Sequence, residues 1–425
     1  MEKQLSLFEL SEENIQYPNK SVYLHIRKEL RENEVKLLES AELLNLCPIE
    51  AWTAVGTNKD LSYLTHGAFR YFGKFPPPIA SYLIQEYTLK DDLVWDLMCG
   101  SGTTGVEAIL LNRFCNLNDV NPLSRLISRV KTRYIDKEVL ENAMQRIINN
   151  YKPLTKEQYW VETLENINYE HWFLPETINS LLGIKYLIDQ EENENVKEFL
   201  LLVLASTVRR VSKATTQQGR LFLDIKTACE DAVPIFIKKG KNIIEGISSL
   251  PKDSNDRVNV FGFNLKNDLP TEFYGSTKLV ILHPPYFNSY KYSSINSLEM
   301  SWLGYNHAEI RKEEVREFFK VGKAEKVQFY VEDMITVIRN ASKLLKKNGI
   351  LALMIGDTVI KREHIKVTQQ IIDRLKHDSD NILSLEKIAL RVPKYTEASW
   401  VASQRRKSND IGINLYDYVI LFRRK

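Results

Sequence analysis

Long apolar runs are absent from this chain of 425 residues, although 44% of its residues are hydrophobic. No stretch reaches the length of a membrane-spanning helix, and the start Met1–Gln4 does not begin a secretory signal. Cysteine is scarce, and the four cysteines, Cys47, Cys99, Cys115 and Cys229, show no metal-ligand spacing. We therefore expect a cytoplasmic protein with reduced cysteines, no membrane association and no bound metal.

The chain also has little net charge, because neither positive nor negative side chains predominate. Lysine and arginine number 58 against 55 aspartate and glutamate residues, which leaves a net charge of +3. This balance argues against a uniformly basic nucleic-acid binder, so any basic surface has to be local. The length is enough for two units, or for one domain with a large insertion.

A glycine-rich turn lies between an apolar strand and a helix near residue 100. The strand Leu93–Met98 leads into Cys99–Gly105, and a helix is predicted over Val106–Leu111. Glycine permits a tight turn and a close approach of the backbone to a ligand, and a helix N-terminus offers free N–H groups. A second strand, Phe114–Asp119, ends in an acid at the spacing that suits ribose hydroxyls. This unit predicts a nucleotide-type ligand.

The acid Asp96 inside the first strand separates two interpretations of this turn. Gly100, Gly102 and Gly105 followed by Asp119 also fit a dinucleotide fingerprint, so a nicotinamide oxidoreductase remains an alternative. Phosphate binding has no obvious use for a carboxylate just before the glycines. The ammonium of an amino-acid group does, and S-adenosylmethionine carries both such a group and a ribose.

The tetrapeptide His283-Pro284-Pro285-Tyr286 ends the apolar run Leu279–Leu282. Two prolines end the hydrogen bonding of a strand, and the residue before a proline is kept out of the helical region. We therefore predict a rigid extended turn at the carboxyl end of a strand, where ligands bind in open α/β sheets. A plain strand-ending turn is the alternative.

The pattern of apolar residues divides the chain into four parts. We expect a helical arm over 1–60, the cofactor-binding half of an α/β core over 61–135, a helical insertion over 136–256, and the catalytic half of the core over 257–425. Helices of the insertion are predicted over 137–150, 175–189, 196–211 and 221–247, the last broken or kinked at Pro234. Later elements are predicted as strands over 257–264, 350–355, 383–390 and 416–422 and helices over 327–345 and 363–376.

Three segments, taken in order, resemble the amino-group DNA methyltransferases, the adenine-N6 and cytosine-N4 class. They are Lys74-Phe75-Pro76-Pro77, the stretch from Asp96 to Thr104, and the His283 tetrapeptide. The resemblance covers 65–135 and 255–425. It implies an α/β, Rossmann-like S-adenosylmethionine-dependent methyltransferase fold, with the helical insertion between its second and third strands.

The resemblance also implies the cofactor site. The methionine part would be held by the glycine turn with Asp96, the ribose by Asp119, and the adenine amino group would face Asn264. The full implied set for S-adenosylmethionine is Lys74, Phe75, Pro76, Asp96, Met98, Gly100, Gly102, Thr103, Thr104, Asp119 and Asn264.

Catalysis is implied for His283, Pro284, Pro285 and Tyr286. Tyr286 would stack on a base flipped out of double-stranded DNA, and the carbonyl of Pro284 would accept a hydrogen bond from its amine. Polar and basic residues after a long helix, and residues of two loops, are the candidate DNA contacts. They are Arg209, Arg210, Lys213, Arg220, Tyr290, Tyr292, Arg405, Arg406 and Lys407.

His283 departs from the family, which usually has Asp, Asn or Ser at this position. A neutral imidazole can accept a hydrogen bond through one nitrogen, so the acceptor role survives if His283 is unprotonated. Histidine does not decide the target base. We favour cytosine-N4 slightly over adenine-N6, because the loop 286–304 resembles members of the serine type.

Other functions compete with DNA methylation. An RNA or protein amino-methyltransferase would use the same cofactor, and an inactive relative could bind S-adenosylmethionine and DNA without catalysis. The sequence leaves open the recognition sequence, the oligomeric state and the pairing with a separately encoded restriction nuclease.

Overall fold

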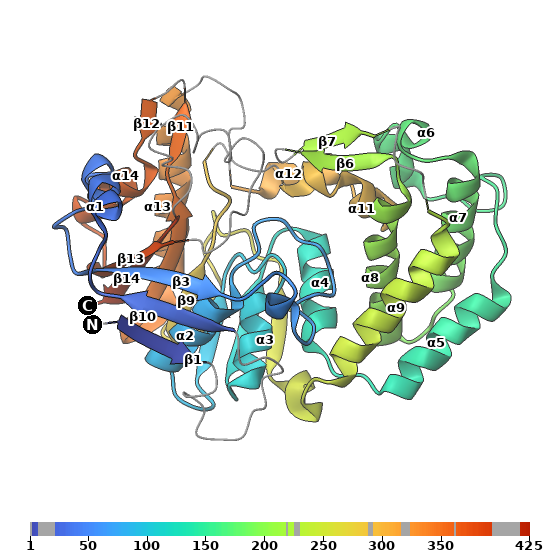
Figure 1. The fold of residues 1–425 in the computed structure, drawn as a ribbon, viewed down its shortest axis with the longest axis horizontal. Helices are drawn as coiled ribbons and strands as arrows, with labels where there is room; N and C mark the ends of the chain where they lie inside the picture. The colour runs from blue at the N-terminus through green and yellow to red at the C-terminus, as the bar shows by residue number, and fades with distance from the viewer. Residues whose placement is uncertain are drawn as a thin grey trace.

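A ten-stranded sheet runs through one half of the protein (Figure 1). The computed structural model describes residues 2–6, 22–217, 220–224, 230–287, 292–315, 324–360, 363–392 and 417–425. The strand order is β1-β2-β3-β13-β14-β10-β9-β4-β5-β8. These strands span Glu2–Ser6, Tyr23–Arg27, Ile49–Val55, Leu383–Arg391, Asp417–Arg424, Leu345–Gly356, Thr277–Leu282, Leu93–Asp96, Phe114–Asn118 and Val258–Phe261.

The centre of this sheet is parallel, from β10 through β9, β4 and β5 to β8. Strand β14 is antiparallel to both of its neighbours and lies between β10 and β13. The chain starts its core at β4 and moves outward to β5 and β8, then returns to the other side of β4 at β9. The strand order therefore reverses between β4 and β9, and ligands bind at such a reversal in open α/β sheets. The predicted Rossmann-like fold class is confirmed.

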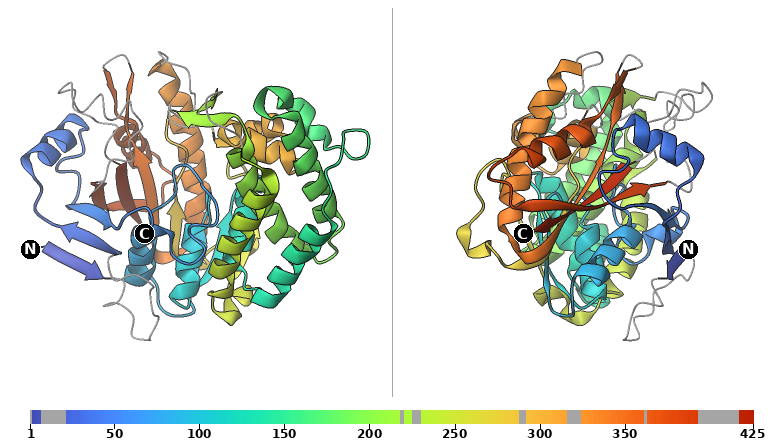
Figure 2. Two further views of the ribbon diagram at one scale, coloured as in Figure 1. Left: turned by 45° about the vertical axis from the view of Figure 1, so that its right-hand side comes forward. Right: turned by 90° about the vertical axis from the view of Figure 1, so that its left-hand side faces the viewer.

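Helices cover both faces of the sheet (Figures 1 and 2). Helices α2 (Pro77–Tyr87) and α3 (Thr103–Leu110) pack on one face, and α1 (Glu32–Ser40), α13 (Val327–Lys343) and α14 (Val367–Lys376) on the other. Strand β9 contributes to both cores: Leu279 and Ile281 face α2, whereas Val280 and Leu282 face α13. This alternation follows from the two-residue period of a strand that is buried on both sides.

The prediction of a helical arm over residues 1–60 is wrong. Helix α1 is flanked by strands β2 and β3, which pair with each other, and β3 pairs with β13 in parallel. The sequence Tyr23–Arg27 has inward-facing Leu24 and Ile26, both buried, at the spacing of a strand. Helix-forming residues around this strand hid the short alternation, which pairing with β3, itself paired with β13, brings into the sheet.

The insertion after β5 forms a separate helical layer on the right of Figure 1. Its elements are α4 (Pro122–Thr132), which leads into it, α5 (Lys137–Asn150), α6 (Tyr169–Trp172), α7 (Pro175–Asp189), α8 (Glu194–Val211), the β6–β7 hairpin (Ala214–Gln217 and Arg220–Leu223) and α9 (Ala232–Ser248). The predicted helices over 137–150, 175–189 and 196–211 are confirmed within two residues. The predicted helix over 221–247 is wrong at its start, because residues 220–223 form strand β7. Pro234 lies in the first turn of α9, where a proline is tolerated, and breaks nothing.

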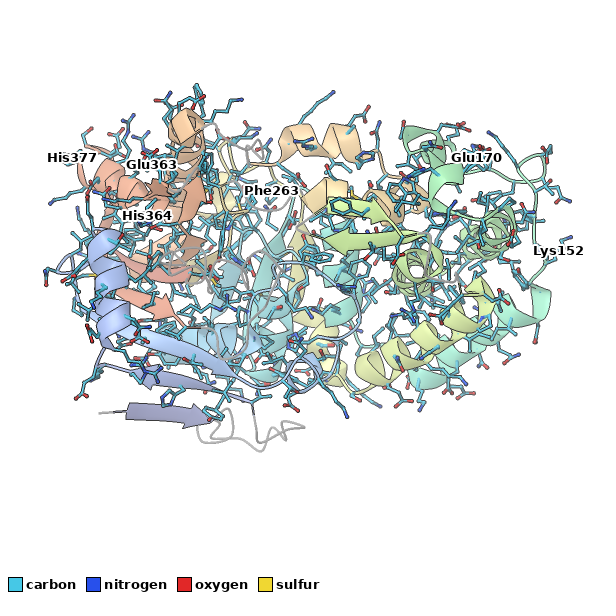
Figure 3. The ribbon with its side chains drawn as sticks, turned by 45° about the horizontal axis from the view of Figure 1, so that its top comes forward. Lys152, Glu170, Phe263, Glu363, His364 and His377 are labelled. Carbon is cyan, nitrogen blue, oxygen red and sulfur yellow. The ribbon has the colours of Figure 1, made fainter. Side chains whose placement is uncertain are left out.

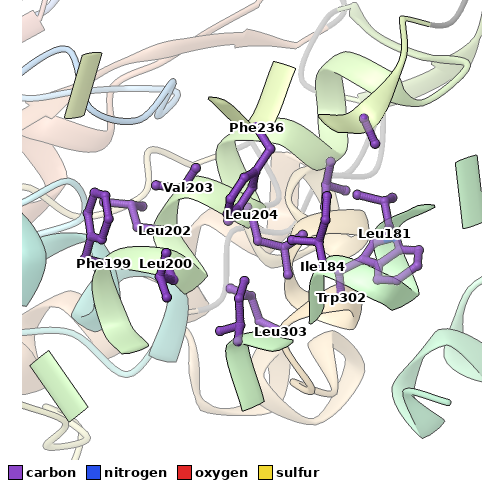
Figure 4. Close-up of a cluster of buried hydrophobic side chains, with 14 of the residues drawn as sticks. Leu181, Ile184, Phe199, Leu200, Leu202, Val203, Leu204, Phe236, Trp302 and Leu303 are labelled. Carbon is purple, nitrogen blue, oxygen red and sulfur yellow. The ribbon is translucent and has the colours of Figure 1, made fainter. Parts of the chain in front are cut away.

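The hydrophobic core of the insertion includes a segment from later in the chain, beyond β9. Helix α11 (Ser297–Trp302) follows the His283 tetrapeptide in sequence, yet Leu298, Met300 and Trp302 are buried among side chains of α7, α8 and α9. Figure 4 shows Trp302 and Leu303 beside Leu181, Ile184 and Leu204. The segment after the tetrapeptide is therefore anchored in the insertion.

The remaining elements complete the core. Short helices α10 (Tyr292–Ile295) and α12 (His307–Glu313) flank α11, and β11 (Thr358–Ile360) pairs with β12 (Glu363–Ile365). The predicted strand pair at the C-terminus is confirmed as β13 and β14, and the predicted helix over 363–376 begins only at Val367. No helix in the described part of the chain is both long and apolar enough to cross a membrane.

Gly183 sets how closely α7 packs on the segment before it. A β-carbon added to Gly183 would lie 2.1 Å from the carbonyl oxygen of Lys152. We predict that Gly183→Ala lowers the free energy of unfolding by about 2 kcal/mol, because the backbone at Lys152 has to move. Urea denaturation checks this, with Ser180→Ala on the same helix as control. Equal midpoints for the two variants would contradict the prediction.

Candidate functional site

A pocket opens at the carboxyl ends of β4 and β9, where the strand order reverses. It holds about 890 Å³ of space, including its open mouth. The register pairs Asp96 with Ile281, so the glycine turn and the His283 tetrapeptide leave the sheet at the same edge. Of the predicted site residues, those that line this pocket are Lys74, Phe75, Asp96, Met98, Gly100, Asp119, Asn264, His283 and Pro285.

The glycine turn has the conformation that its residues predict. Gly100 and Gly102 have φ angles of +48° and +68°, which side-chain-bearing residues rarely adopt. Gly102 is the residue before α3, and a β-carbon there would lie 2.8 Å from the Ser128 hydroxyl oxygen. The turn therefore needs glycine at Gly102 for both space and conformation. Gly102, Thr103 and Thr104 shape the turn from behind and do not line the pocket.

Asp96 is a buried acid at the base of the pocket. Its carboxylate accepts hydrogen bonds from the Thr104 hydroxyl at 2.5 Å and from the backbone N–H of Met98 at 3.3 Å. Burial nevertheless raises the pKa of Asp96 to about 7, with a smaller contribution from the charge of Asp119. A buried carboxylate with this pKa favours a cationic ligand, whose charge would compensate for the lost water.

Asp119 follows β5 and faces the same pocket. It accepts hydrogen bonds from the backbone N–H groups of Gly100, at 3.0 Å, and Asn121, at 2.9 Å. Burial raises the pKa of Asp119, and these two hydrogen bonds and the guanidinium of Arg125 oppose the increase. These hydrogen bonds hold the Asp119 carboxylate next to the glycine turn, in the pocket that Asp96 also lines.

Behind the pocket lies a buried polar cluster that the sequence did not indicate. Lys74 Nζ donates to the carbonyl of His66, and burial lowers the pKa of Lys74 to about 8. Glu107 accepts a hydrogen bond from Tyr63 at 2.5 Å, and its Oε1 lies 2.8 Å from His66 Nε2. Burial raises the pKa of Glu107 to about 8. The ammonium of Lys131 donates to the carbonyl of Ser101 in the glycine turn. The cluster therefore fixes both Lys74 and the turn from the protein side.

His283 lies between two aromatic rings. Its ring centroid is 5.5 Å from that of Phe75 and 5.6 Å from that of Tyr286, and its Nε2 is 3.3 Å from the Tyr286 hydroxyl. Burial, with a smaller contribution from the positive charge of Arg391, lowers the pKa of His283 to about 3. The imidazole is therefore neutral at physiological pH and can accept a hydrogen bond.

The proline turn is held by a tyrosine from α13. The Tyr330 hydroxyl donates to the carbonyl of Pro285 at 2.7 Å, and Pro284 is buried. The Tyr286 ring lies close to the backbone of Gly356, at the end of β10. Pro76 caps α2 and, like Pro284 and Tyr286, does not line the pocket. Tyr330 has no sequence signal as a site residue, since it lies within an ordinary amphipathic helix.

The opposite wall of the pocket comes from α12 and the residues after it. Asn264 donates from its amide to Glu313 Oε2 at 2.8 Å, and Glu313, Glu314 and Val315 line the pocket. Tyr71 lines it as well, and its hydroxyl is 2.9 Å from the Ser124 hydroxyl. The spacing in sequence gave no reason to place these acids next to Asn264, because α12 reaches the pocket only through the fold.

The side chain of Arg209, a predicted DNA contact, forms hydrogen bonds within the protein. Its guanidinium donates to Glu299 at 2.8 Å, to the Thr216 hydroxyl at 2.6 Å and to the carbonyl of Ile295 at 2.5 Å. These partners belong to α11, the β6–β7 hairpin and α10. We therefore reassign Arg209 from DNA contact to a residue that joins the insertion to the segment after the tetrapeptide.

The other predicted DNA contacts are placed only in part. Arg210 is largely exposed and pairs with Glu230, and Lys213 donates to the carbonyl of Glu170 at 3.0 Å. Tyr290, Arg405, Arg406 and Lys407 lie outside the described residues, and so do the side chains of Arg220 and Tyr292.

Residues 8–149 match the family model described as DNA methylase. Among curated proteins, the type II methyltransferase M.MvaI of Kocuria varians is 24% identical over 269 residues, which cover 58% of this chain and 59% of that protein. The type II methyltransferase M.BsoBI of Geobacillus stearothermophilus is 24% identical over 318 residues, covering 67% of this chain and 60% of that protein. The chain thus spans about three fifths of the length of these relatives.

Among solved structures, the geranyl diphosphate C-methyltransferase from Streptomyces coelicolor A3(2), with Mg2+, geranyl diphosphate and S-adenosyl-L-homocysteine, matches with a TM-score of 0.31 and 8% identity. The match covers 82% of this chain and 80% of that one. A likeness at this level carries no argument about function.

The pocket offers groups that fit S-adenosylmethionine: Asp96 would accept from its ammonium, Lys74 would pair with its carboxylate and Asp119 would accept from its ribose hydroxyls. We predict that its affinity rises between about pH 5.5 and 7.5, because Asp96 has to lose its proton to bind the ammonium. Titration calorimetry across this range checks this. Thr104→Val should move the midpoint to higher pH, since it removes the hydrogen bond that stabilises the carboxylate. Asp91→Asn, at an exposed acid away from the pocket, should leave the curve unchanged, whereas an unchanged Thr104→Val curve would contradict the assignment.

We also predict that the ion pair between Arg209 and Glu299 stabilises the fold. The two side chains are only 17% and 4% exposed, so Arg209→Met leaves Glu299 buried without its partner. The loss of unfolding free energy should be about 3 kcal/mol, and Arg209→Met/Glu299→Met should lose less than the two single variants added. Arg210→Met, next to it in an exposed pair, should cost less than about 1 kcal/mol. Additive losses in denaturant titrations would argue against the coupling.

Proposed function

Since residues 8–149 carry the match to the DNA methylase family, we propose that this chain is a site-specific DNA methyltransferase. It transfers the methyl group of S-adenosylmethionine to the exocyclic amino group of a base in double-stranded DNA. The observation that carries the proposal is that Lys74, Asp96 and His283, each from a different motif, line one pocket. The nicotinamide oxidoreductase alternative has no use for the His283 tetrapeptide at that place.

The cofactor supplies an electrophilic methyl group on its sulfonium. Asp96 would accept hydrogen bonds from its ammonium, and Lys74, which the buried polar cluster fixes, would pair with its carboxylate. Asp119 would accept from the ribose hydroxyls. Asn264, whose amide donates to Glu313 in this structure, would face the adenine amino group. Holding two reactants in one geometry in this way supplies a large part of the rate of a transfer between them.

The base enters next to His283. Tyr286 stacks on the flipped base, and the carbonyl of Pro284 accepts one hydrogen bond from the target amine. His283 accepts the second, because an imidazole with a pKa of about 3 is neutral. With both hydrogen bonds accepted, the nitrogen lone pair would be free to take the methyl group that S-adenosylmethionine supplies when bound. His283 is too weak a base to keep the proton that the amine releases, so this proton passes to solvent.

The target is cytosine-N4 in preference to adenine-N6, on the resemblance of the loop after Tyr286 to the serine type. A cognate restriction nuclease, encoded separately, is a partner that fits a cytoplasmic enzyme with type II relatives. RNA or protein amino-methylation, and binding without catalysis, are the competing functions.

The experiment is methyl transfer from labelled S-adenosylmethionine to unmethylated genomic DNA, with nucleoside analysis of the product. We expect N4-methylcytosine, and N6-methyladenine would keep the class but change the base. Label in RNA or protein but not in DNA would overturn the proposal. Cofactor binding without any transfer would favour the inactive relative.

His283→Ala and Tyr286→Ala test the base pocket. Each should lower kcat by about 100-fold or more, because the amine loses its acceptor or its stacking partner. The cofactor affinity should stay within about twofold, which shows that the fold is intact. Matched controls are His377→Ala, on the exposed end of α14 in Figure 3, and Tyr186→Ala, which is 37% exposed on α7. Full activity of both pocket variants would show that the pocket is assigned wrongly.

A further inference from the structure

A group of cations lies where the insertion meets the segment that leads into the cofactor pocket. Arg70 belongs to that segment, Arg210 to the last turn of α8, and Lys238 and Lys239 to the first half of α9. The Ser206 hydroxyl on α8 donates to the carbonyl of Ala68 at 3.2 Å, which holds the segment against α8 one turn before Arg210. Helices α8 and α9 are packed neighbours in Figure 1. We call Arg70, Arg210, Lys238 and Lys239 the basic cluster.

The segment around Arg70 points its side chains in three directions. Phe69 is buried in the core of the insertion, and Tyr71 lines the cofactor pocket. Arg70 between them is exposed, and its guanidinium lies over the Phe72 ring at 5.2 Å from the ring centroid. Stacking of this kind fixes the plane of a guanidinium while its N–H groups remain available for an anion. Arg70 is therefore fixed in position relative to the pocket.

The charges of the basic cluster act on one another. Burial and repulsion from Arg210, Lys238 and Arg70 lower the pKa of Lys239, and Glu230 opposes this repulsion. Glu230 pairs with Arg210. Within the described part of the chain, Arg70, Lys238 and Lys239 form no ion pair with a carboxylate. In a protein with a net charge of only +3, this is a local excess of positive charge that needs an anionic partner.

We propose that Arg70, Lys238 and Lys239 bind the phosphodiester backbone of the DNA substrate, with Arg210 at the margin of the site. The inference rests on the proposed function and adds three contacts, Arg70, Lys238 and Lys239, that the sequence did not indicate. Duplex DNA offers a regular row of phosphates, and neutralising each one releases a counterion. Backbone contacts of this kind set the register of a protein on the duplex and do not read its sequence.

Arg70 lies only a few residues before side chains that line the cofactor pocket, so a phosphate bound there would be positioned relative to the cofactor. The same segment continues through Tyr71 to Lys74, all within a few residues, and Tyr71 and Lys74 line the cofactor pocket. A phosphate held at Arg70 would therefore fix the duplex at a set distance from the bound cofactor. Lys238 and Lys239 would extend the contact along α9, on the insertion.

The test uses the full chain and a fluorescein-labelled DNA duplex of about 30 base pairs, of arbitrary sequence because the backbone term is sequence-independent. Binding is measured by fluorescence anisotropy over a series of salt concentrations. Arg70→Gln/Lys239→Gln is compared with Lys346→Gln/Lys347→Gln, which removes the same charge from exposed lysines at the start of β10. The pocket lies at the other end of the parallel strands.

We expect Arg70→Gln/Lys239→Gln to weaken DNA binding by about tenfold and to lower the slope of log K against log salt by about 2, since each phosphate contact contributes about 0.9. The control variant should keep the affinity and slope of the unchanged protein. Cofactor affinity should be the same in all three proteins, which reports on folding. In the methyl-transfer assay, the KM for DNA should rise while kcat stays within about twofold.

The outcomes separate this inference from the proposed function. If the unchanged protein methylates DNA, but Arg70→Gln/Lys239→Gln binds with the affinity and slope of the control, the basic cluster is not a DNA contact. If the unchanged protein neither binds nor methylates DNA, the proposed function fails first. Tighter binding of an RNA duplex of equal length, lost in the same variant, would overturn the assignment to DNA.

Discussion

The burial of the Asp96 carboxylate is the constraint on which the site depends. An acid at the end of a buried strand has lost its water, and two hydrogen bonds from Thr104 and Met98 replace only part of it, so its pKa is about 7. Those two donors are in place only because the glycine turn brings the start of α3 back over the end of β4. A cationic ligand group would supply the compensating charge that the protein itself does not place next to Asp96. The glycines, Thr104 and the buried Lys131 behind the turn all help to hold the Asp96 carboxylate in position.

A second set of contacts joins the helical insertion to the segment after the His283 tetrapeptide. The segment after the His283 tetrapeptide could have packed on the sheet, yet α11 enters the hydrophobic core of the insertion, and Arg209 bonds to Glu299 and to the carbonyl of Ile295. The helices that contact DNA in the proposed function and α11, which follows the tetrapeptide proposed to contact the base, are thereby parts of one packed unit. A displacement of the insertion would displace the base pocket with it, because a close-packed core transmits strain.

His283 shows how the fold can keep a function when the residue changes. A histidine in water is partly protonated near neutral pH and would repel the approaching cationic cofactor. Between Phe75 and Tyr286 and within reach of the charge of Arg391, the ring has lost its water and its pKa is about 3. The environment thus converts an ionisable side chain into a neutral hydrogen-bond acceptor, the property that the proposed amine contact requires.

The sequence alone determined the local elements and the order of the motifs. The glycines at Gly100 and Gly102, the prolines after His283 and the helical period over 137–150 and 175–189 act within a few residues, so their effects are visible without the fold. The resemblance carried by the three motifs in order was enough for the Rossmann-like class and for nine of the 22 residues that line the pocket.

The tertiary structure decided everything that depends on residues distant in sequence. Strands β2 and β3 form because the edge of β13 is available, and neither propensity nor period in that stretch outweighed the surrounding helix formers. Arg209 is a buried ion-pair partner and not an exposed cation, because Glu299, 90 positions away, reaches it through the packing of α11. The pKa values of Asp96, Lys74 and His283 likewise come from burial, which no single segment contains. The sequence specified the groups that the three motifs bring to the site, and the packing of distant segments specified their charge state and their neighbours.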